Sequence, residues 1–274
     1  MPNVNLSLSE INVYPIKSLR GVSKQSANVY RTGFQYDRSW MLVDEDHKFI
    51  TQRQYSKLAL VDVDITEKQI SLHAPGQAGL IVPNTARQNI IDVKIWSDQC
   101  KASVATDAVN EWFSKYLSKR CLLVTMAENY QRAVNPDYRS SSNDIVSFAD
   151  GYPFLLITEA SLAELNKRMQ EEGSPAVPMK RFRPNLVVKG TDAHDEDRWK
   201  KIKIGDCVFD IVKPCSRCII PTINTDTGDK AKEPMKTLLT YRKKDSKVYF
   251  GQNLIPVYQP GLVLSVGDVV EVIC

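Results

Sequence analysis

Short β-strand-like segments separated by turns make up the first hundred residues, and this pattern limits the fold more than any other feature. Apolar and β-branched residues dominate or alternate in six such segments, residues 10–17, 39–45, 48–54, 58–66, 68–74 and 90–96. Turn-forming residues such as Asp44 to Asp46 separate several of them. Strands at this density are typical of a barrel-like or sandwich-like β unit.

Two helices are predicted among the later strands. Residues 107–117 place Val109, Trp112, Phe113 and Tyr116 on one helical face. The clearer helix covers residues 158–173, with Thr158 as the N-cap, an apolar repeat along its length and Gly173 at its end. The apolar repeat consists of Leu162, Leu165 and Met169.

The second half of the chain is also rich in predicted strands, with residues 140–143 as a loop. The predicted strands are residues 121–126, 184–190, 200–206, 207–213 and 267–274. We therefore expect a β-rich α+β fold, in which a β-barrel-like domain of residues 1–118 precedes a second β domain of residues 119–274 with one or two packed helices.

The chain length and composition are those of an ordinary globular protein. The 274 residues are 43% hydrophobic and 25% charged, and the net charge is +4. Since the Lys and Arg residues are spread along the chain, nothing indicates a nucleic-acid partner. No segment resembles a signal peptide or a membrane span, so we expect a cytoplasmic protein with no membrane partner.

Cys215 and Cys218 form a CxxC pair, and the sequence alone leaves its role open. A structural zinc site is disfavoured, because the chain has no second CxxC and its three histidines are far apart. Dithiol exchange is disfavoured because Pro221 and three isoleucines follow Cys218 and would make a poor first helical turn. Buried, inert cysteines remain possible, although Arg217 places a charge beside the thiols that favours thiolate.

Basic and hydroxyl side chains gather at the ends of several predicted strands. Residues 14–21 (YPIKSLRG) contain Lys17 and Ser18, and Arg38 lies in YDRSW. Residues 180–188 (KRFRPNLVV) contain Arg183 and Asn185. Each residue singly is best explained as a solvated surface group, but together they are the donor set of a phosphate or oxyanion site.

Six ordered motifs together resemble the MOSC proteins, which are named for the molybdenum cofactor sulfurase C-terminal domain. The motifs are YPIKSLRG, DRSW, TQRQ, SFADGYPFLLITEASLAELNKR, RFRPNLVV and KPCSRCIIPTINTDTG. The closest branch includes bacterial YcbX and the mitochondrial amidoxime-reducing component, and the resemblance spans an N-terminal β-barrel domain and a MOSC domain.

This resemblance implies a molybdenum ion on molybdopterin without a nucleotide, with Cys218 as the metal ligand and catalytic residue. A single soft thiolate suits that metal and leaves positions open for substrate. Cys215 would not be a ligand. The implied cofactor contacts are Lys17, Ser18, Arg38, Asp150, Arg183, Asn185, Ser216 and Arg217.

The implied activity is the two-electron reduction of small N-hydroxylated compounds such as amidoximes, hydroxylamines and N-hydroxylated bases. YcbX-type relatives often carry a [2Fe–2S] domain with a C-x₄-C-x₂-C run. Because this sequence has no such run, we expect either that a separate flavin or iron–sulfur protein donates the electrons or that the chain was cut from a longer one. A carrier of the cofactor or of persulfide sulfur is the alternative, and a β scaffold that has lost its cofactor is a third.

Overall fold

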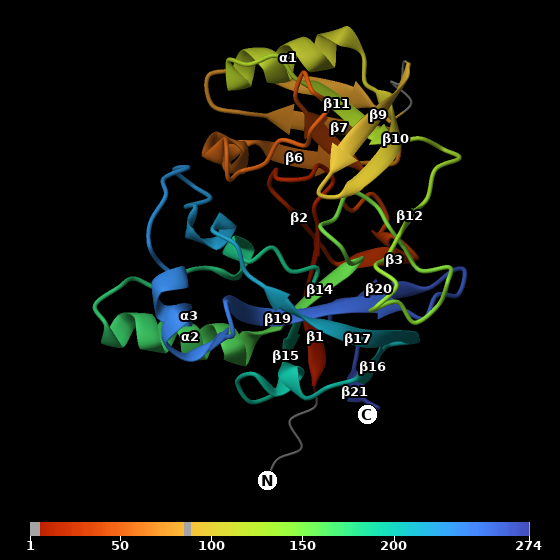
Figure 1. The fold of residues 1–274 in the computed structure, drawn as a ribbon. Helices are drawn as coiled ribbons and strands as arrows, with labels where there is room; N and C mark the ends of the chain where they lie inside the picture. Colours follow the sequence, from red (N-terminus) through yellow and green to blue (C-terminus); the bar gives the residue numbers. More distant parts are fainter. Residues whose placement is uncertain (1–5, 85–88, 274) are drawn as a thin grey trace.

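A computed structural model describes residues 6–84 and 89–273 of the chain. The ribbon has two lobes, one above the other, and the chain passes between them more than once (Figure 1). Both lobes are rich in strands, as predicted, and the fold class is β-rich α+β. None of the helices among the described residues has the length and apolar character needed to cross a bilayer.

Two small antiparallel sheets, a 3₁₀ turn and one helix form the upper lobe (Figure 1). One sheet has the order β5-β11-β10-β9 and the other β6-β7-β8. The predicted helix of residues 107–117 is confirmed as α1, which buries Val109, Trp112 and Phe113. The elements are β5 (Trp40–Val43), η1 (Ser56–Leu60), β6 (Asp62–Ile65), β7 (Gln69–His73), β8 (Leu80–Pro83), β9 (Ile90–Ile95), β10 (Asp98–Val104), α1 (Asp107–Leu117) and β11 (Leu122–Met126).

A nine-stranded sheet forms the lower lobe, with the order β2-β1-β15-β14-β19-β17-β16-β21 and β18 paired to β19. Its strands pair antiparallel except for β14 and β15. The strands are β1 (Ser7–Val13), β2 (Val22–Lys24), β14 (Phe154–Thr158), β15 (Leu186–Lys189), β16 (Lys201–Ile204), β17 (Cys207–Ser216), β18 (Lys243–Lys244), β19 (Lys247–Pro256) and β21 (Val270–Val272).

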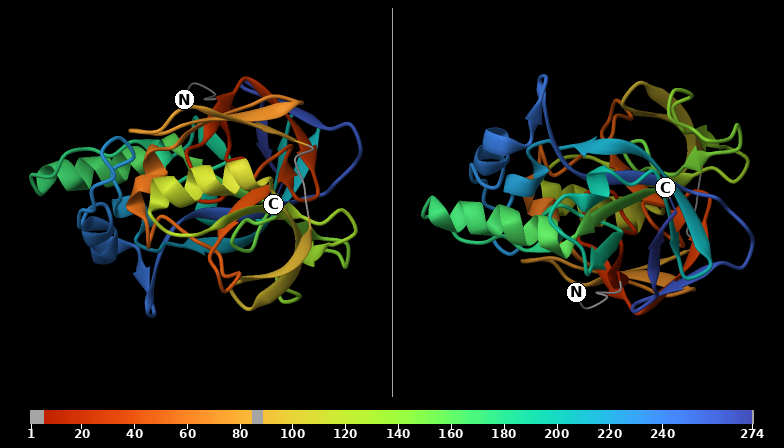
Figure 2. Two further views of the ribbon diagram at one scale, coloured as in Figure 1. Left: turned by 90° about the horizontal axis from the view of Figure 1, so that it is seen from above. Right: turned by 90° about the horizontal axis from the view of Figure 1, so that it is seen from below.

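Two helices, α2 (Glu159–Glu171) and α3 (Met235–Tyr241), lie together on one side of this lobe (Figure 2). The predicted N-cap of α2 is confirmed, because the Thr158 side chain accepts a hydrogen bond from the Ser161 amide. Leu165 and Met169 of α2 pack with Phe182 and Phe250 in one apolar cluster. Burying this stripe against the sheet stabilises a helix that would be marginal alone.

Short elements complete the fold. They are β3 (Ser26–Tyr30), β4 (Gly33–Phe34), β12 (Arg132–Ala133), β13 (Ile145–Val146), η2 (Met179–Arg181), η3 (Asp195–Asp197), η4 (Ile220–Thr222) and β20 (Val263–Ser265). β3 pairs with β4 and with β20 near the other end of the chain.

Strand pairings cross the domain boundary that we place at residue 118. β1 pairs with β15 of the lower sheet, whereas β11 pairs with β5 and β10 of the upper one. Residues from both sides of position 118 therefore share sheets, and the division into residues 1–118 and 119–274 stays a prediction.

Four strand predictions need correction, and the first is residues 10–17, where β1 (Ser7–Val13) begins earlier and ends at Val13. Residues 48–54 are not a strand, because Gln54 folds back and its side-chain oxygen accepts a hydrogen bond from the Thr51 amide. Residues 58–60 belong to η1, and only the end of that predicted strand is β6. The last predicted strand is β21, and Cys274 lies outside the described residues.

The sequence does not predict several of the strands, among them β10, β14 and β19, and β19 lies near the middle of the large sheet. Gly251 interrupts its apolar pattern with φ of 81°. A Cβ at this position would lie 2.7 Å from the Leu156 carbonyl oxygen, so the close approach of β14 requires glycine.

Candidate functional site

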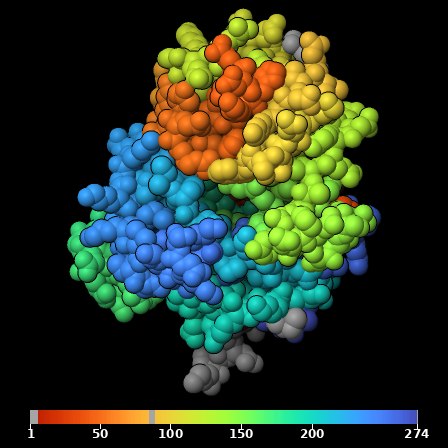
Figure 3. Space-filling model, in the orientation of Figure 1, coloured from red at the N-terminus to blue at the C-terminus, as the bar shows by residue number. Residues whose placement is uncertain are grey.

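A cleft lies between the two lobes, and the space-filling view is hollowed there (Figure 3). Its inner part is a cavity of about 140 Å³. All nine residues that we predict to bind cofactor or metal line this cavity, namely Lys17, Ser18, Arg38, Asp150, Arg183, Asn185, Ser216, Arg217 and Cys218. The fold thus brings together side chains that are up to about two hundred positions apart in the sequence.

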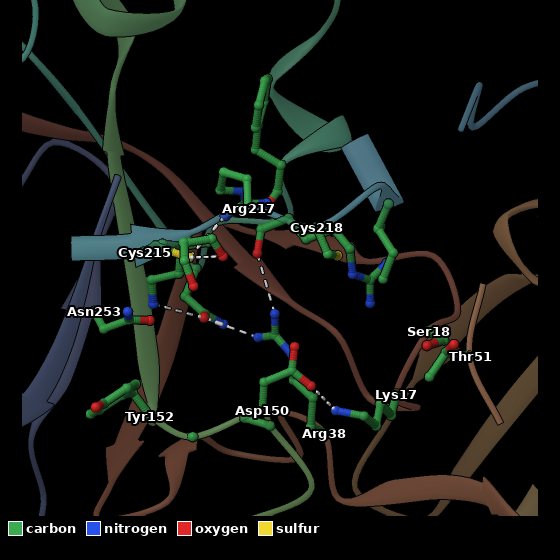
Figure 4. Close-up of a pocket in the computed structure, with 18 of the residues that line it drawn as sticks. Lys17, Ser18, Arg38, Thr51, Asp150, Tyr152, Cys215, Arg217, Cys218 and Asn253 are labelled. Carbon is green, nitrogen blue, oxygen red and sulfur yellow. Dashed lines mark hydrogen bonds and ion pairs between the residues drawn. The ribbon is translucent and has the colours of Figure 1, made fainter. Parts of the chain in front are cut away.

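Lys17 and Asp150 form an ion pair at the cavity wall (Figure 4). The Lys17 ammonium is buried and donates to the Asp150 carboxylate at 2.5 Å and to the Phe148 carbonyl at 2.8 Å. Loss of hydration raises the pKa of Asp150, but the charge and hydrogen bond of Lys17 outweigh it, so the pKa lies below its ordinary value. Asp150 is therefore a carboxylate, and one cavity cation is already neutralised.

A buried network holds the next cation, Arg38. Its guanidinium donates to Asp37 at 2.6 Å and to the Asn185 side-chain oxygen at 2.9 Å. The Asn185 amide nitrogen in turn donates to Asp37 and to the Asn12 carbonyl, both at 3.1 Å. Both ends of the Asn185 side chain are thus bonded within the protein, which favours a positioning role over direct cofactor contact.

Arg183 faces this network with few acceptors of its own. Its guanidinium and that of Arg38 each lie 4.3 Å from the centre of the Tyr14 ring. Burial and the nearby Arg38 charge lower the pKa of Arg183 to about 10. The two cations disfavour each other, and an anion in the cavity would relieve that repulsion.

Three cavity residues have a left-handed backbone that non-glycine residues seldom adopt. The φ angles are 70° at Ser18, 46° at Arg38 and 59° at Arg183. Such conformations cost roughly 1–3 kcal/mol each and persist where the surrounding structure enforces them, often at binding sites.

The cysteine loop closes the cavity from the lower lobe. Cys215 is in β17, and the exposed Cys218 lies between that strand and η4 (Figure 4). The Arg217 guanidinium donates to the Cys215 sulfur at 3.1 Å. The arginine beside Cys218 is instead Arg53, whose Nη1 lies 4.0 Å from the sulfur. The two thiols thus have different surroundings, although they are three positions apart.

Our sequence analysis did not select Arg53, although it lies in the quoted TQRQ motif. Thr51 of the same motif, Tyr152 and Asn253 also line the cavity. The TQRQ segment was interpreted as a strand, and only its turn conformation shows that these side chains reach the cleft.

The other described cysteines do not line the cleft. Cys100, Cys121 and Cys207 are buried and make no disulfide. Burial raises the pKa of both Cys121 and Cys207 to about 11. Cys207 packs in the apolar core of the lower lobe and does not face the site.

The charge of the inner cavity is strongly positive. Its lining holds one carboxylate, Asp150, against five cations, which are Lys17, Arg38, Arg53, Arg183 and Arg217. The Nε of Arg217 is also buried without a partner in the described structure. Such a donor set suits a buried anion such as a phosphate.

Metal binding here would depend on few protein ligands. Within residues 6–84 and 89–273, no group of three His, Cys, Asp or Glu side chains is placed to hold a metal ion. The exposed Cys218 thiol offers one soft ligand beside the positive cavity. The residues present therefore fit a metal that arrives on an anionic organic cofactor.

A second, larger cavity of about 630 Å³ adjoins the first. The two share nine lining residues, including Cys215, Cys218 and Asp150, and so form one continuous cleft. The inner part is cationic and polar, and the outer part is open to solvent and contains Trp96 and Tyr152.

Comparison with known proteins finds two family domains along the chain. Residues 5–120 match the MOSC N-terminal beta barrel domain, and residues 143–271 match the MOSC domain. A mitochondrial amidoxime reducing component 2 from Rattus norvegicus is 36% identical, with 88% of this chain and 74% of that protein covered.

Two further relatives have lower sequence identity to this chain. Human mitochondrial amidoxime-reducing component 1 is 30% identical, covering 96% of this chain and 81% of its own. A molybdenum cofactor sulfurase from Oryza sativa subsp. japonica is 29% identical over 90% of this chain, which spans 32% of that protein. The resemblance predicted from the six motifs is confirmed.

Proposed function

This chain belongs to the MOSC family, among the proteins that carry both a MOSC N-terminal β-barrel domain and a MOSC domain, and on that premise we propose that it is a molybdenum-cofactor-dependent oxidoreductase. Its substrates are small N-hydroxylated compounds such as amidoximes and hydroxylamines. The observation that carries the proposal is the convergence of five cations and the exposed Cys218 thiol on one cleft.

The residues of the inner cavity would hold the cofactor by charge. Arg183, Arg38 and Lys17 offer guanidinium and ammonium donors to a terminal phosphate, and Arg217 has a buried Nε without a protein partner. Asn185 and Asp37 hold Arg38 in place. Cys218 is the metal ligand, and Cys215 is not.

When bound, a molybdenum ion on molybdopterin supplies two-electron chemistry at a position that is open to the substrate. The overall reaction is R₂N–OH + 2 e⁻ + 2 H⁺ → R₂NH + H₂O. The N–O bond breaks, and the oxygen leaves as water. A separate flavin or iron–sulfur protein supplies the electron pair, and solvent in the open outer cleft supplies the protons.

Metal analysis of the wild-type protein, Cys218→Ala and Cys215→Ala tests the assignment of the ligand. After expression in a molybdenum-replete host, we expect about one molybdenum per chain in the wild type and in Cys215→Ala, and a loss in Cys218→Ala. Unaltered molybdenum in Cys218→Ala would disprove the ligand assignment. Turnover of an amidoxime with a chemically reduced dye as electron donor then tests the activity.

A sulfur carrier is the second candidate, because Arg217 donates directly to the Cys215 sulfur. In that case Cys215 would carry a persulfide and the protein would have no reductase turnover. Mass spectrometry of the intact protein would detect one added sulfur atom, which Cys215→Ala would lack. Absence of that sulfur together with amidoxime turnover would exclude the carrier role.

A further inference from the structure

The wall of the outer cavity has a large and exposed aromatic side chain, Trp96. The residue is 46% exposed, whereas Trp40, Trp112 and Trp199 are at most 9% exposed. Burial of an indole normally contributes strongly to stability. The exposed indole of Trp96 lies on the wall of a cleft that contains Cys218, where a ligand in the cleft would contact it.

Trp96 is also an unusual choice for its backbone position. Ile95 pairs with Asp98, so Trp96 and Ser97 form the two-residue turn between β9 and β10. Trp96 has φ of 54°. The first position of such a turn with positive φ normally holds glycine or asparagine, because a bulky side chain is strained there. The backbone conformation of this turn alone would thus favour glycine or asparagine over tryptophan.

The indole is nevertheless held firmly by three neighbours. Its ring centre lies 5.0 Å from that of Phe49, and the Arg53 guanidinium lies 4.7 Å from the ring. The indole nitrogen donates to Asp150 at 3.3 Å. The ring is thus fixed before any ligand binds, which lowers the entropy cost of stacking on it.

The same contacts connect Trp96 to the reacting end of the cleft. Arg53 stacks on Trp96 and places its Nη1 4.0 Å from the Cys218 sulfur. Asp150, the acceptor of the indole N–H, also pairs with Lys17 of the inner cavity. A substrate that reaches Cys218 through the outer cavity would pass along this wall.

The charges of the outer cavity disfavour a cationic ligand. Its lining holds four cations, Arg53, Arg132, Lys213 and Arg217, and two carboxylates, Asp98 and Asp150. Asp98 is neutralised by Arg132 at 2.6 Å, and Asp150 by Lys17. An uncharged planar molecule meets no electrostatic penalty here, whereas a protonated amidine does.

We propose that Trp96, supported by Arg53, is a specificity-determining residue that stacks on uncharged planar aromatic N-hydroxylated substrates. The inference rests on the proposed reductase function and narrows its substrate class. Aromatic amidoximes are uncharged at neutral pH, and their amidine products are protonated. The same wall therefore accepts the substrate and disfavours the product.

Steady-state kinetics of wild type and Trp96→Gly test this with two amidoximes that differ only in the ring. For benzamidoxime we expect kcat/KM to fall about 10-fold, a typical value for the loss of one stacking contact. For acetamidoxime we expect a change below about 2-fold. Trp96→Phe should retain most of the benzamidoxime activity, and molybdenum content should not change.

Asp245→Gly is the matched control, because Asp245 and Ser246 form a two-residue turn between β18 and β19. Asp245 has φ of 53° and is exposed, and it lines none of the cavities of the cleft. Its substitution relieves the same backbone strain and should leave both substrates unaffected. Equal losses for both amidoximes in Trp96→Gly, or no loss for either, would overturn the proposal.

Fluorescence separates this inference from the proposed function. Benzamidoxime should quench the exposed Trp96 saturably in the wild-type protein and not in Trp96→Gly, even if no turnover occurs. Acetamidoxime should quench neither. Turnover without this quenching would disprove stacking on Trp96 and leave the reductase function standing. Quenching without turnover would disprove the reductase function and leave stacking on Trp96 standing.

Discussion

The two walls of the cleft are built in opposite ways. The inner wall, which we define as Arg38, Arg183 and Asn185 of the cavity lining with Tyr14 and Asp37 behind them, is mostly buried and densely hydrogen bonded. The outer wall, defined as Arg53, Trp96, Cys215 and Cys218, is more exposed, and it is held by ring, cation–π and sulfur contacts rather than by a buried ionic network.

From this difference we expect the inner wall to hold a bound anion and the outer wall to contact the substrate. A buried charged network has one arrangement, since each unpaired group would cost several kcal/mol. The inner wall therefore suits an anion that stays bound. The outer wall can exchange its contacts with solvent for contacts with a substrate at little cost to the fold. We expect substitutions in the inner wall to lower the free energy of unfolding. Substitutions in the outer wall should change the activity and leave the free energy of unfolding nearly unchanged.

The largest effect should follow from Asp37→Ala in the inner wall. The carboxylate pairs with Arg38 at 2.6 Å and is 2% exposed as a residue, so its loss leaves a buried guanidinium without its main partner. We expect the free energy of unfolding to fall by about 3–5 kcal/mol. Urea denaturation followed by circular dichroism measures it.

Asp62→Ala is the control for that substitution. Asp62 also pairs with an arginine, Arg20, at 2.6 Å, but its side chain is 62% exposed. An exposed pair is screened by water, and we expect a loss of about 1 kcal/mol or less. Equal losses in the two variants would mean that the inner wall is not a stability element.

A smaller effect is expected for Asn185→Ala. Its side chain bonds to Arg38, Asp37 and the Asn12 carbonyl, and hydrogen bonds to charged groups contribute more than neutral ones. We expect a loss of about 2–3 kcal/mol in the same assay.

Asn110→Ala provides the comparison, because Asn110 is buried in the upper lobe and its side chain bonds, among the described residues, to the backbone of Ala105 and Leu123. Its loss should be about 1–2 kcal/mol. A greater loss for Asn110 than for Asn185 would contradict the special role of the charged network.

The sequence predicted the inner wall only in part. Arg38, Arg183 and Asn185 stand in motifs at strand ends, where oxyanion donors are expected. Asp37 precedes Arg38 directly, yet nothing local indicates that it is buried, because that depends on Asn185, which lies just before β15 and 148 positions away. Burial of a charge is a property of packing between distant segments.

The fold was predictable where local pattern and tertiary packing agree. Helices α1 and α2 have apolar repeats that the sequence shows directly, and α2 also has a side-chain N-cap at Thr158. β19 was missed because Gly251 interrupts its pattern, and the reason for that glycine is the neighbouring Leu156 carbonyl. The pairing of β1 with β15 across most of the chain length likewise has no local signal.

Asp150 pairs with Lys17 of the inner cavity and accepts a hydrogen bond from Trp96 of the outer wall, and its contribution to the free energy of unfolding should depend on pH. Since its folded-state pKa lies below the ordinary value of 3.8, its ion pair stabilises the protein above that pH, and this contribution is lost as the pH falls through and below 3.8. The wild type should exceed Asp150→Asn in stability at pH 6, and the difference should shrink by pH 3.

The size of that difference should stay below about 1 kcal/mol, because the Asp150 side chain is 63% exposed and solvent screens the pair. Urea titrations at several pH values measure it. If the stability advantage of the wild type over Asp150→Asn instead grew as the pH falls, the pKa of Asp150 would lie above its ordinary value. Lys17 would then not stabilise the carboxylate.

The smallest change in stability is expected for Cys218→Ser in the outer wall. The thiol is exposed and its nearest charged partner, Arg53, is 4.0 Å away, so we expect the free energy of unfolding to change by less than about 0.5 kcal/mol. In the cofactor-free protein, a thiol reagent should label Cys218 before the buried Cys207. Since Cys207 packs in the core, its labelling should require unfolding. A destabilised Cys218→Ser variant would mean that the outer wall also supports the fold, and the separation of the two walls would fail.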